Sequence, residues 1–184
     1  MKALSINGLL QAVYAFQDIR VLPFLYMDGA RQNLAKSFIF YVVTLLFLAV
    51  GAITTLGLPW YAQIAVPSGT PAAWLVAVIW GSIFFLAAFS VHRFWDAPRS
   101  RGFRLTLSMY AAVGALVLCW NYLFFGLHLL MPAFVVSVIV ALMHLSLIGR
   151  LWGAARRAAY LLLPYFVWVA YAAWLCYQFA VINP

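Results

Sequence analysis

The C-terminal stretch of this chain, residues 158–183, reads AAYLLLPYFVWVAYAAWLCYQFAVIN, carries no charge and strongly constrains the fold. As a helix, with a rise of about 1.5 Å per residue, it is long enough to cross the roughly 30 Å apolar layer of a membrane. Pro164 interrupts its hydrogen-bond ladder, and a membrane helix tolerates this where neighbouring segments satisfy the freed carbonyl. The stretch therefore predicts a transmembrane helix that packs against partner helices.

Four residues of this stretch fall at successive i+4 positions: Pro164, Trp168, Ala172 and Cys176. Residues spaced by four lie on one face of a helix, one above the other. The large flat ring of Trp168 then lies next to the small side chain of Ala172. This face is predicted to form one wall of a cavity.

Composition identifies the environment of the chain. Hydrophobic residues make up 68% of the sequence and aromatic residues 18%, and the mean hydropathy is +1.03, whereas an ordinary soluble domain is about 45–50% apolar. The net charge of +8 would suggest nucleic acid in a soluble protein, but the eleven Lys and Arg lie in short connections between apolar runs. We therefore predict an integral membrane protein that contacts membrane lipid and binds no nucleic acid.

Five apolar runs are long enough to span a membrane, and the connections between them alternate in charge. Basic residues precede the first run, separate the second from the third, and separate the fourth from the fifth. By the positive-inside rule the N-terminus is then cytoplasmic and the C-terminus lies on the far side. The predicted fold is an all-α integral membrane protein, a five-transmembrane-helix bundle with spans at 37–56, 72–92, 105–126, 132–151 and 158–181.

Residues 1–37 differ from the rest of the chain, because charged residues and Pro23 interrupt every apolar run there. Leu9, Val13 and Phe16 share one helical face, which predicts a short amphipathic helix lying on the membrane. Lys2 precedes a moderately apolar run, but no A-x-A-like site follows it, which argues against a cleaved signal peptide. The predicted organisation is an N-terminal interfacial or cytoplasmic segment, 1–37, followed by a membrane domain, 38–184.

The connection after the first span reads GLPWYAQIAVPSGTPAAW. Thr70 and Pro71 predict the start of the second span, with the Thr hydroxyl as cap and the proline at the first helical position. Trp60 and Tyr61 are predicted in this loop at the membrane face, where such residues are typical of an aromatic belt. Trp80, in the second span, falls inside the apolar layer.

Three stretches carry a resemblance to a known family: PSGTPAAWLVAVIWGSIFF, CWNYLFFGLH and the C-terminal stretch quoted above. They resemble the tryptophan-rich sensory protein family, TspO/MBR, also called translocator protein or peripheral benzodiazepine receptor. The order of the motifs, their spacing and the five-span layout all fit that family. The resemblance covers about residues 51–184 and leaves the N-terminal segment outside it.

The resemblance implies a five-helix bundle, usually a homodimer, with a ligand pocket that opens toward the loop after the first span. It also implies ligands of three kinds: porphyrins such as haem and protoporphyrin IX, sterols, and synthetic drugs. A flat macrocycle is best held by aromatic faces in an apolar pocket. With the cavity wall proposed above, the expected ligand-binding residues are Trp60, Tyr61, Pro71, Trp80, Trp120, Trp168, Ala172 and Cys176.

The chain also departs from the family pattern. The third span has Val113 and Val117 where the family usually shows Gln and Asn, and the fifth has Cys176 where the family usually shows Asn. The loop lacks a Trp at Gly69 and a second Pro at Ala72. The pocket is therefore expected to be less polar than is typical, which affects the choice of ligand and not the fold.

Other reactive residues form no recognisable constellation. His144 lies within a span without a second metal ligand at helical spacing, and we expect it to hydrogen-bond a neighbouring helix rather than bind metal. Cys119 and Cys176 also fall within spans and form no C-x-x-C motif. The sequence thus predicts no catalytic residues, no metal site and no obligatory cofactor, with porphyrin or haem as a ligand.

Three other classes of function compete with ligand binding. Ion-coupled transport normally needs carboxylates within the membrane, and the chain has no Glu and its three Asp lie outside the predicted spans. An enzyme would need an acid-base, nucleophile or metal constellation that is missing, although the resemblance implies light-dependent porphyrin degradation in some relatives. A structural or regulatory subunit without a small-molecule ligand stays open. The small face of Ala111, Gly114 and Ala115 suits a homodimer, and it would equally suit packing within the bundle. The expected location is a bacterial inner membrane.

Overall fold

The computed structural model describes residue 38, residues 41–98 and residues 102–184. The helix nearest the N-terminus among these, Tyr41–Tyr61, is followed by α2 (Ala73–Trp95), α3 (Phe103–Asn121), the π-helical turn η1 (Tyr122–Gly126), α4 (Leu130–Ala154) and α5 (Arg156–Ile182). With η1 continuing α3, five helices in the described residues are long and apolar enough to cross a membrane. This confirms the predicted fold class. The predicted amphipathic helix around Leu9, Val13 and Phe16 lies outside the described residues.

The first of these helices is longer at its C-terminal end than the sequence analysis predicted. It continues past residue 56 and includes Trp60 and Tyr61, which were assigned to the loop. Pro59 lies in its last turns, where it removes a single helical hydrogen bond, and membrane helices tolerate such a loss. The two aromatic residues are therefore held on a helix end.

The predicted start of α2 is wrong in its detail. The cap position is Ala72, without a side-chain hydrogen bond, and the helix begins at Ala73. The Thr70 hydroxyl instead donates to the carbonyl of Pro67 at 2.9 Å. A short hydroxyl side chain often bonds nearby loop backbone in preference to a helix end, so Thr70 stabilises the loop.

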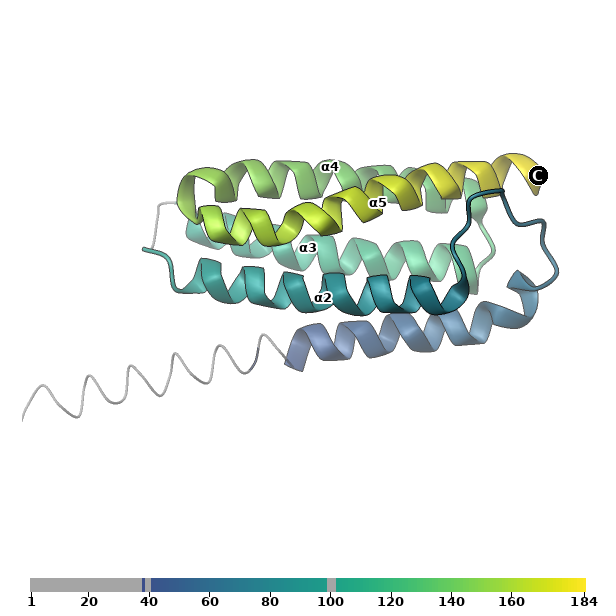
Figure 1. Ribbon diagram of the computed structural model, residues 1–184, viewed down its shortest axis with the longest axis horizontal. Coiled ribbons are helices and arrows are strands. Elements are labelled where there is room, and N and C mark those ends of the chain that lie inside the picture. The colour runs from purple at the N-terminus through teal and green to yellow at the C-terminus, as the bar shows by residue number, and fades with distance from the viewer. Residues whose placement is uncertain (1–37, 39–40, 99–101) are drawn as a thin grey trace, which may run out of the picture. The chain divides into compact units, whose positions relative to one another are not determined.

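Helix α5 is the best-packed element of the bundle. It makes its most extensive contacts with α4 and also packs against α2, while α3 packs against α4 (Figure 1). The Tyr41–Tyr61 helix contacts α2 through Phe47 and Phe84, whose ring centroids are 5.5 Å apart. It contacts α3 through a hydrogen bond of 2.8 Å from Asn121 to Thr54. Every span therefore has the partners that the apolar sequence requires.

The two ends of the bundle differ in charge. The end formed by the C-termini of α2 and α4 and the N-termini of α3 and α5, called here the basic end, carries Arg93, Arg104, Arg150, Arg156 and Arg157. The opposite end, called here the loop end, holds residues 62–72, η1 and the C-terminus of α5 (Figure 1). The described part of the loop end has no Lys, Arg, Asp or Glu. This is the asymmetry on which the predicted orientation rests.

Candidate functional site

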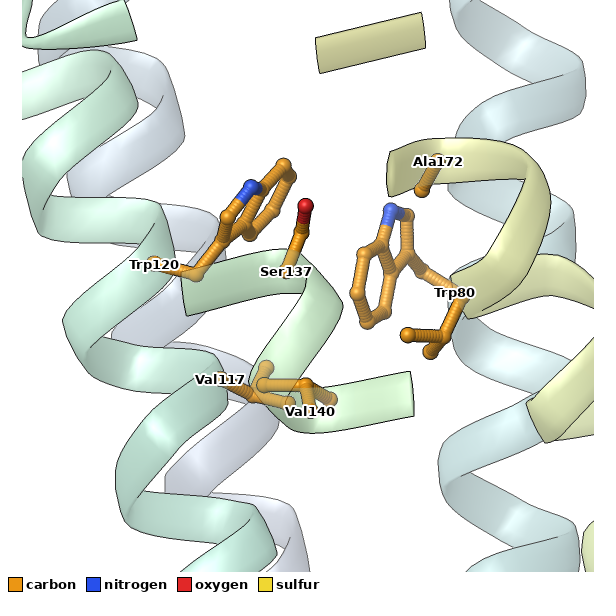
Figure 2. A pocket seen from close by; sticks show the side chains of 7 residues that line it. Trp80, Val117, Trp120, Ser137, Val140 and Ala172 are labelled. Carbon is orange, nitrogen blue, oxygen red and sulfur yellow. The ribbon is translucent and has the colours of Figure 1, made fainter. Parts of the chain in front are cut away.

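Four helices meet around a small cavity in the middle of the bundle. It has a volume of about 10 Å³ and is lined by Trp80, Val117, Trp120, Ser137, Val140, Val169 and Ala172. Figure 2 shows the Trp80 and Trp120 indoles on opposite sides of Ser137, with Val117 and Val140 on one side of them and Ala172 near Trp80. A cavity of this size holds about one water molecule. The protein's own side chains therefore fill most of this space.

The three tryptophans expected to form the pocket come together here. Trp80 stacks on Trp120 with centroids 5.8 Å apart and an interplanar angle of 27°. The same ring meets Trp168 edge-on, at 6.4 Å and 88°. Each arrangement is favourable for indoles and is worth about 0.5–1.5 kcal/mol beyond area burial. Trp80 is thus the centre of a group of indoles contributed by α2, α3 and α5, called here the tryptophan cluster.

Two indole nitrogens of this cluster differ in their hydrogen bonding. The Trp120 Nε1–H donates to the Cys176 sulfur at 3.1 Å. The Trp168 Nε1 is buried and has no hydrogen-bond partner among the described residues. A buried donor without an acceptor is unfavourable by about 1–3 kcal/mol. A ligand oxygen placed against Trp168 would remove that penalty.

A second group of rings lies toward the loop end. Tyr61 contacts Phe124, Phe125 and Phe179, with centroids 5.7–6.4 Å apart. Trp60 meets Phe124 edge-on at 5.9 Å and stacks on the His128 ring at 4.1 Å and 13°. We call this group the outer cluster. Phe124 joins it to the tryptophan cluster, because its ring is also 5.9 Å from that of Trp120.

The outer cluster depends on the π-helical turn η1, which the sequence analysis did not predict. A Cβ added to Gly57 would lie 2.5 Å from the Phe125 carbonyl oxygen, so only glycine allows the first helix to approach η1 this closely. Single-turn π-bulges occur frequently at functional sites. Here the turn places Phe124 in the interior, where it is 3% exposed.

The 62–72 loop is fastened to α5 at two points. The Tyr171 hydroxyl donates to the Gly69 carbonyl at 2.6 Å. The Asn183 side chain bonds both backbone groups of Ala65, accepting from the N–H at 2.9 Å and donating to the carbonyl at 3.0 Å. Ile64 packs against the rings of the outer cluster. Figure 1 shows this connection running from α2 to the C-terminal part of α5, so the loop covers the loop end of the site.

Gly69 explains one departure from the family pattern. Its φ of 97° is a conformation that L side chains rarely adopt. A Cβ there would lie 3.6 Å from the Tyr171 hydroxyl and 3.8 Å from the Trp174 ring. At these distances a Cβ would make ordinary contact with the rings of Tyr171 and Trp174, which stack at 5.6 Å, so the positive φ rather than a lack of space favours glycine at 69.

The expected cavity wall on α5 is only partly correct. Ala172 lines the cavity and Cys176 receives the Trp120 hydrogen bond, but Pro164 and Trp168 line a groove on the outer surface between α2 and α5. A spacing of four residues advances by about 40° more than a full turn. Over the three steps from Pro164 to Cys176 the direction of these side chains rotates by about 120° around the helix axis, so the first two face the surface and the last two face the interior.

Some lining residues were not foreseen, and one expected residue stays apart. Ser137 and Val140 of α4 and Val169 of α5 line the cavity without any motif that marks them. Ser137 is three residues before Val140, so the two side chains share a helical face. This spacing is the one sequence feature that could have indicated that Ser137 lines the cavity. Pro71 lies in the loop before α2 and makes no ring contact or hydrogen bond with the clusters in the described residues.

His144 is held by a hydrogen bond within its own helix. The expectation that His144 hydrogen-bonds a neighbouring helix is wrong, because its Nδ1 pairs with the Val140 carbonyl of its own helix at 3.0 Å. Its ring packs on Tyr165 of α5 at 4.2 Å. Cys119 is exposed and Cys176 is buried. No group of three His, Cys, Asp or Glu suited to a metal ion occurs in the described residues.

Fold and site together define a multi-pass α-helical membrane protein with an internal, tryptophan-lined site. The model of the TspO/MBR family matches residues 38–182. The translocator protein of Ovis aries is 31% identical over 134 residues, covering 72% of this chain and 79% of that protein. Protein CrtK of Rhodobacter capsulatus is 29% identical over 74% of this chain and 85% of its own length. The chain belongs to the TspO/MBR family.

A bacterial relative covers more of the chain. The tryptophan-rich protein TspO of Bacillus cereus is 29% identical over 149 residues, which is 79% of this chain and 94% of that protein. These similarities extend over most of the membrane domain. They agree with the family that the tryptophan motifs indicated.

Proposed function

We propose that this protein is a membrane receptor for flat hydrophobic ligands of the porphyrin class, such as haem or protoporphyrin IX, with a regulatory, transport or porphyrin-handling role. The observation that carries the proposal is the tryptophan cluster, in which three indoles from three helices meet next to a buried, unpaired Nε1–H. Aromatic faces grip a flat ring system by stacked or edge-on contacts. The indole donor supplies one polar contact for a ligand oxygen.

Binding requires the site to open. Pockets for organic ligands occupy about 300–1,000 Å³, and the cavity here has about 10 Å³. Trp80 and Trp120 stack on each other, so a flat ligand would replace ring contacts that these indoles now make with one another. The receptor thus binds by shifting to a conformation in which the rings separate.

The test is a protoporphyrin IX titration followed by Soret absorbance on the purified protein. Trp80→Ala and Trp168→Ala are expected to weaken binding roughly tenfold or more, since about 1.4 kcal/mol corresponds to one decade of affinity. Trp152→Ala is the matched control, because this tryptophan is 41% exposed and lies near the basic end of α4. Unchanged affinity in both cluster variants would overturn the proposal. An equal loss in all three would indicate general destabilisation instead.

The alternative is a structural or regulatory membrane subunit that binds no small molecule. The small cavity favours it, because the closed side-chain packing is stable without an occupant. A ligand that binds only the folded protein raises its apparent stability with concentration. The alternative therefore predicts no thermal shift with porphyrins, sterols or other flat ligands on folded protein.

We also propose that the protein forms a homodimer through the exposed small residues of α3. Ala111, Ala115 and Cys119 are exposed at successive i+4 positions. Gly114 instead faces Leu46 of the first helix, 3.2 Å from an added Cβ, so it serves packing within the bundle. Oxidation should crosslink two copies of the chain through Cys119. Ala115→Leu should reduce this crosslinking. The control Ala170→Leu, at an exposed position of α5, should leave it unchanged. Equal crosslinking in all forms would remove this face from the interface.

The distribution of basic residues supports a cytoplasmic N-terminus, and we propose a bacterial inner membrane as the location. A reporter fused before Met1 should then be active on the cytoplasmic side, and one fused after Pro184 on the opposite side. Two cytoplasmic reports would contradict an odd number of spans.

A further inference from the structure

The outer surface of the bundle carries a groove between α2 and α5 that is separate from the internal cavity. It has a volume of about 680 Å³ and is lined by Val78, Ile79, Ser82, Ile83, Leu86, Tyr160, Leu163, Pro164, Val167 and Trp168. Residues 78–86 of α2 and 160–168 of α5 run along it, and the eight steps along each helix correspond to about 12 Å. The groove is thus an elongated, almost entirely apolar depression on the lipid-facing surface.

One end of the groove lies at the depth of the lipid headgroups. Tyr160 meets Trp152 edge-on at 5.1 Å, and the Arg156 guanidinium lies 5.6 Å from the centre of the Trp152 ring. Aromatic residues next to basic residues are typical of the membrane interface. The groove therefore begins at the interface of the basic end and runs inward to Trp168.

Two arginines continue the groove beyond this end. Arg93 follows Leu86 by seven residues on α2, and Arg157 precedes Pro164 by seven residues on α5. Because seven residues make almost two full helical turns, each arginine lies on nearly the same face of its helix as the groove residue. The Ser90 hydroxyl donates to the Ala158 carbonyl at 2.8 Å, which brings these two helices to the same depth. Both arginines are exposed. The spacing therefore places one exposed cation on each helix beyond the apolar groove.

We propose that this groove binds one anionic phospholipid of the membrane leaflet at the basic end, with an acyl chain along the groove and the phosphate between Arg93 and Arg157. The charge at one end and the apolar length behind it match the two parts of such a lipid. Basic sites at the cytoplasmic ends of membrane helices bind anionic headgroups in this way. The groove shares Trp168 with the tryptophan cluster, but the proposal does not require that the protein binds porphyrin.

A second copy of the chain fits this surface less well. A dimer in one membrane with a two-fold axis brings equivalent residues of the same depth toward each other. Arg93 and Arg157 of one copy would then face the same arginines of the partner, and like charges across an interface are unfavourable. The exposed small residues of α3 carry no such charges.

The test compares lipids and variants in detergent, by native mass spectrometry and by thermal stability. The probes are dioleoyl phosphatidylglycerol, dioleoyl phosphatidylcholine with the same chains, and glycerophosphoglycerol, which has the anionic headgroup and no chains. The wild type should retain one phosphatidylglycerol in preference to the other two probes. Arg93→Gln and Arg157→Gln should each weaken this retention roughly fivefold, because a basic residue near an anionic surface contributes on that scale.

Two controls separate a built site from general attraction. Arg104→Gln removes an exposed cation of the same end on α3 and should change nothing. Ser82→Trp fills the groove and should abolish retention of phosphatidylglycerol. Leu142→Trp, at an exposed position of α4, should retain the lipid. Thermal melting in phosphatidylcholine checks that each variant is folded. An equal loss with Arg104→Gln, retention by Ser82→Trp, or tight binding of glycerophosphoglycerol would overturn the proposal. So would a shift of Ser82→Trp from dimer to monomer, which would show that a second copy covers the groove.

Discussion

The basic end and the loop end of this bundle are packed by different kinds of contact. At the basic end, Leu147, Leu151 and Leu162 are 0–1% exposed and pack against the fully buried Ala158 and Ala159. At the loop end, rings meet rings in stacked, edge-on and tilted contacts, a π-helical turn interrupts the regular helix, and the covering loop is held by exposed hydrogen bonds. The contact between α4 and α5 at the basic end is thus an aliphatic seam, beside which Phe94 stacks on Phe103 at 5.0 Å, whereas the loop end is mainly an assembly of aromatic rings.

This difference indicates where the bundle can open. Separating aliphatic side chains that pack on small residues leaves a void, and nothing in the membrane fills it with equal density. Separating two aromatic rings forfeits about 0.5–1.5 kcal/mol per pair, which a flat aromatic ligand restores by stacking in their place. A ligand therefore exchanges contacts at the loop end, while the basic end keeps the helices together.

The largest expected effect is a loss of stability on truncating the basic-end core. Leu162 is 1% exposed, and Leu→Ala in a packed core lowers the free energy of unfolding by about 2–5 kcal/mol. Leu162→Ala should accordingly lower the apparent melting temperature in detergent, with porphyrin affinity unchanged at temperatures where the variant is folded. The control Leu142→Ala, at a position 59% exposed, should melt close to the wild type. Equal losses at the two positions would contradict the view that the basic-end core holds the bundle together.

A smaller effect is expected where the first helix meets the π-helical turn. In Gly57→Ala the new Cβ would lie 2.5 Å from the Phe125 carbonyl oxygen, so backbone must shift, and overpacking of this kind is unfavourable by about 1–3 kcal/mol. Because Phe125 belongs to the outer cluster, this variant should change Trp fluorescence as well as stability. Gly51→Ala in the same helix has nothing within 4 Å of the new Cβ and should behave as wild type. A normal melting curve for Gly57→Ala would mean that the approach of the two segments is not tight.

Hydropathy and charge were sufficient to predict five spans and their order, because helix length and apolar composition depend on local sequence alone. The convergence of Trp80, Trp120 and Trp168 followed from the family resemblance. What local sequence does not contain is the tertiary contact that shapes η1, since the motif YLFFG reads as ordinary helix until Gly57 is known to lie against it. For the same reason Ser137 could not be assigned to the cavity.

The fine geometry of the site also escaped a pattern argument. The i+4 spacing on α5 predicts a single cavity wall, but its slow rotation around the helix divides these residues between the lipid-facing groove and the interior. Thr70 stands at a position typical of a helix cap, but its hydroxyl donates to the Pro67 carbonyl within the loop instead. Both errors arise where a small energy difference between neighbouring arrangements is decided by tertiary packing.

The smallest expected effect concerns the hydrogen bonds that hold the 62–72 loop. Tyr171→Phe removes the donor to the Gly69 carbonyl and keeps the ring that stacks on Trp174. An exposed hydrogen bond of this kind contributes about 0.5–1.5 kcal/mol net. The loop should therefore open several times more often, while the bundle melts at the wild-type temperature because its core is untouched.

Hydrogen exchange measures this opening directly, since amides of the loop exchange through local unfolding and those of the core do not. Exchange at residues 65–69 should accelerate by roughly fivefold, the ratio that about 1 kcal/mol produces, and protoporphyrin IX should associate faster with little change in its dissociation rate. Asn183→Ala, which removes both bonds to Ala65, should act in the same direction. The control is Tyr177→Phe, at an exposed position of α5 where the tyrosine packs on Phe134. It should leave the rate of loop exchange and the rate of porphyrin association unchanged. If faster loop exchange leaves porphyrin association unchanged, the ligand enters by another route, and the loop end opens between its helices rather than at its loop.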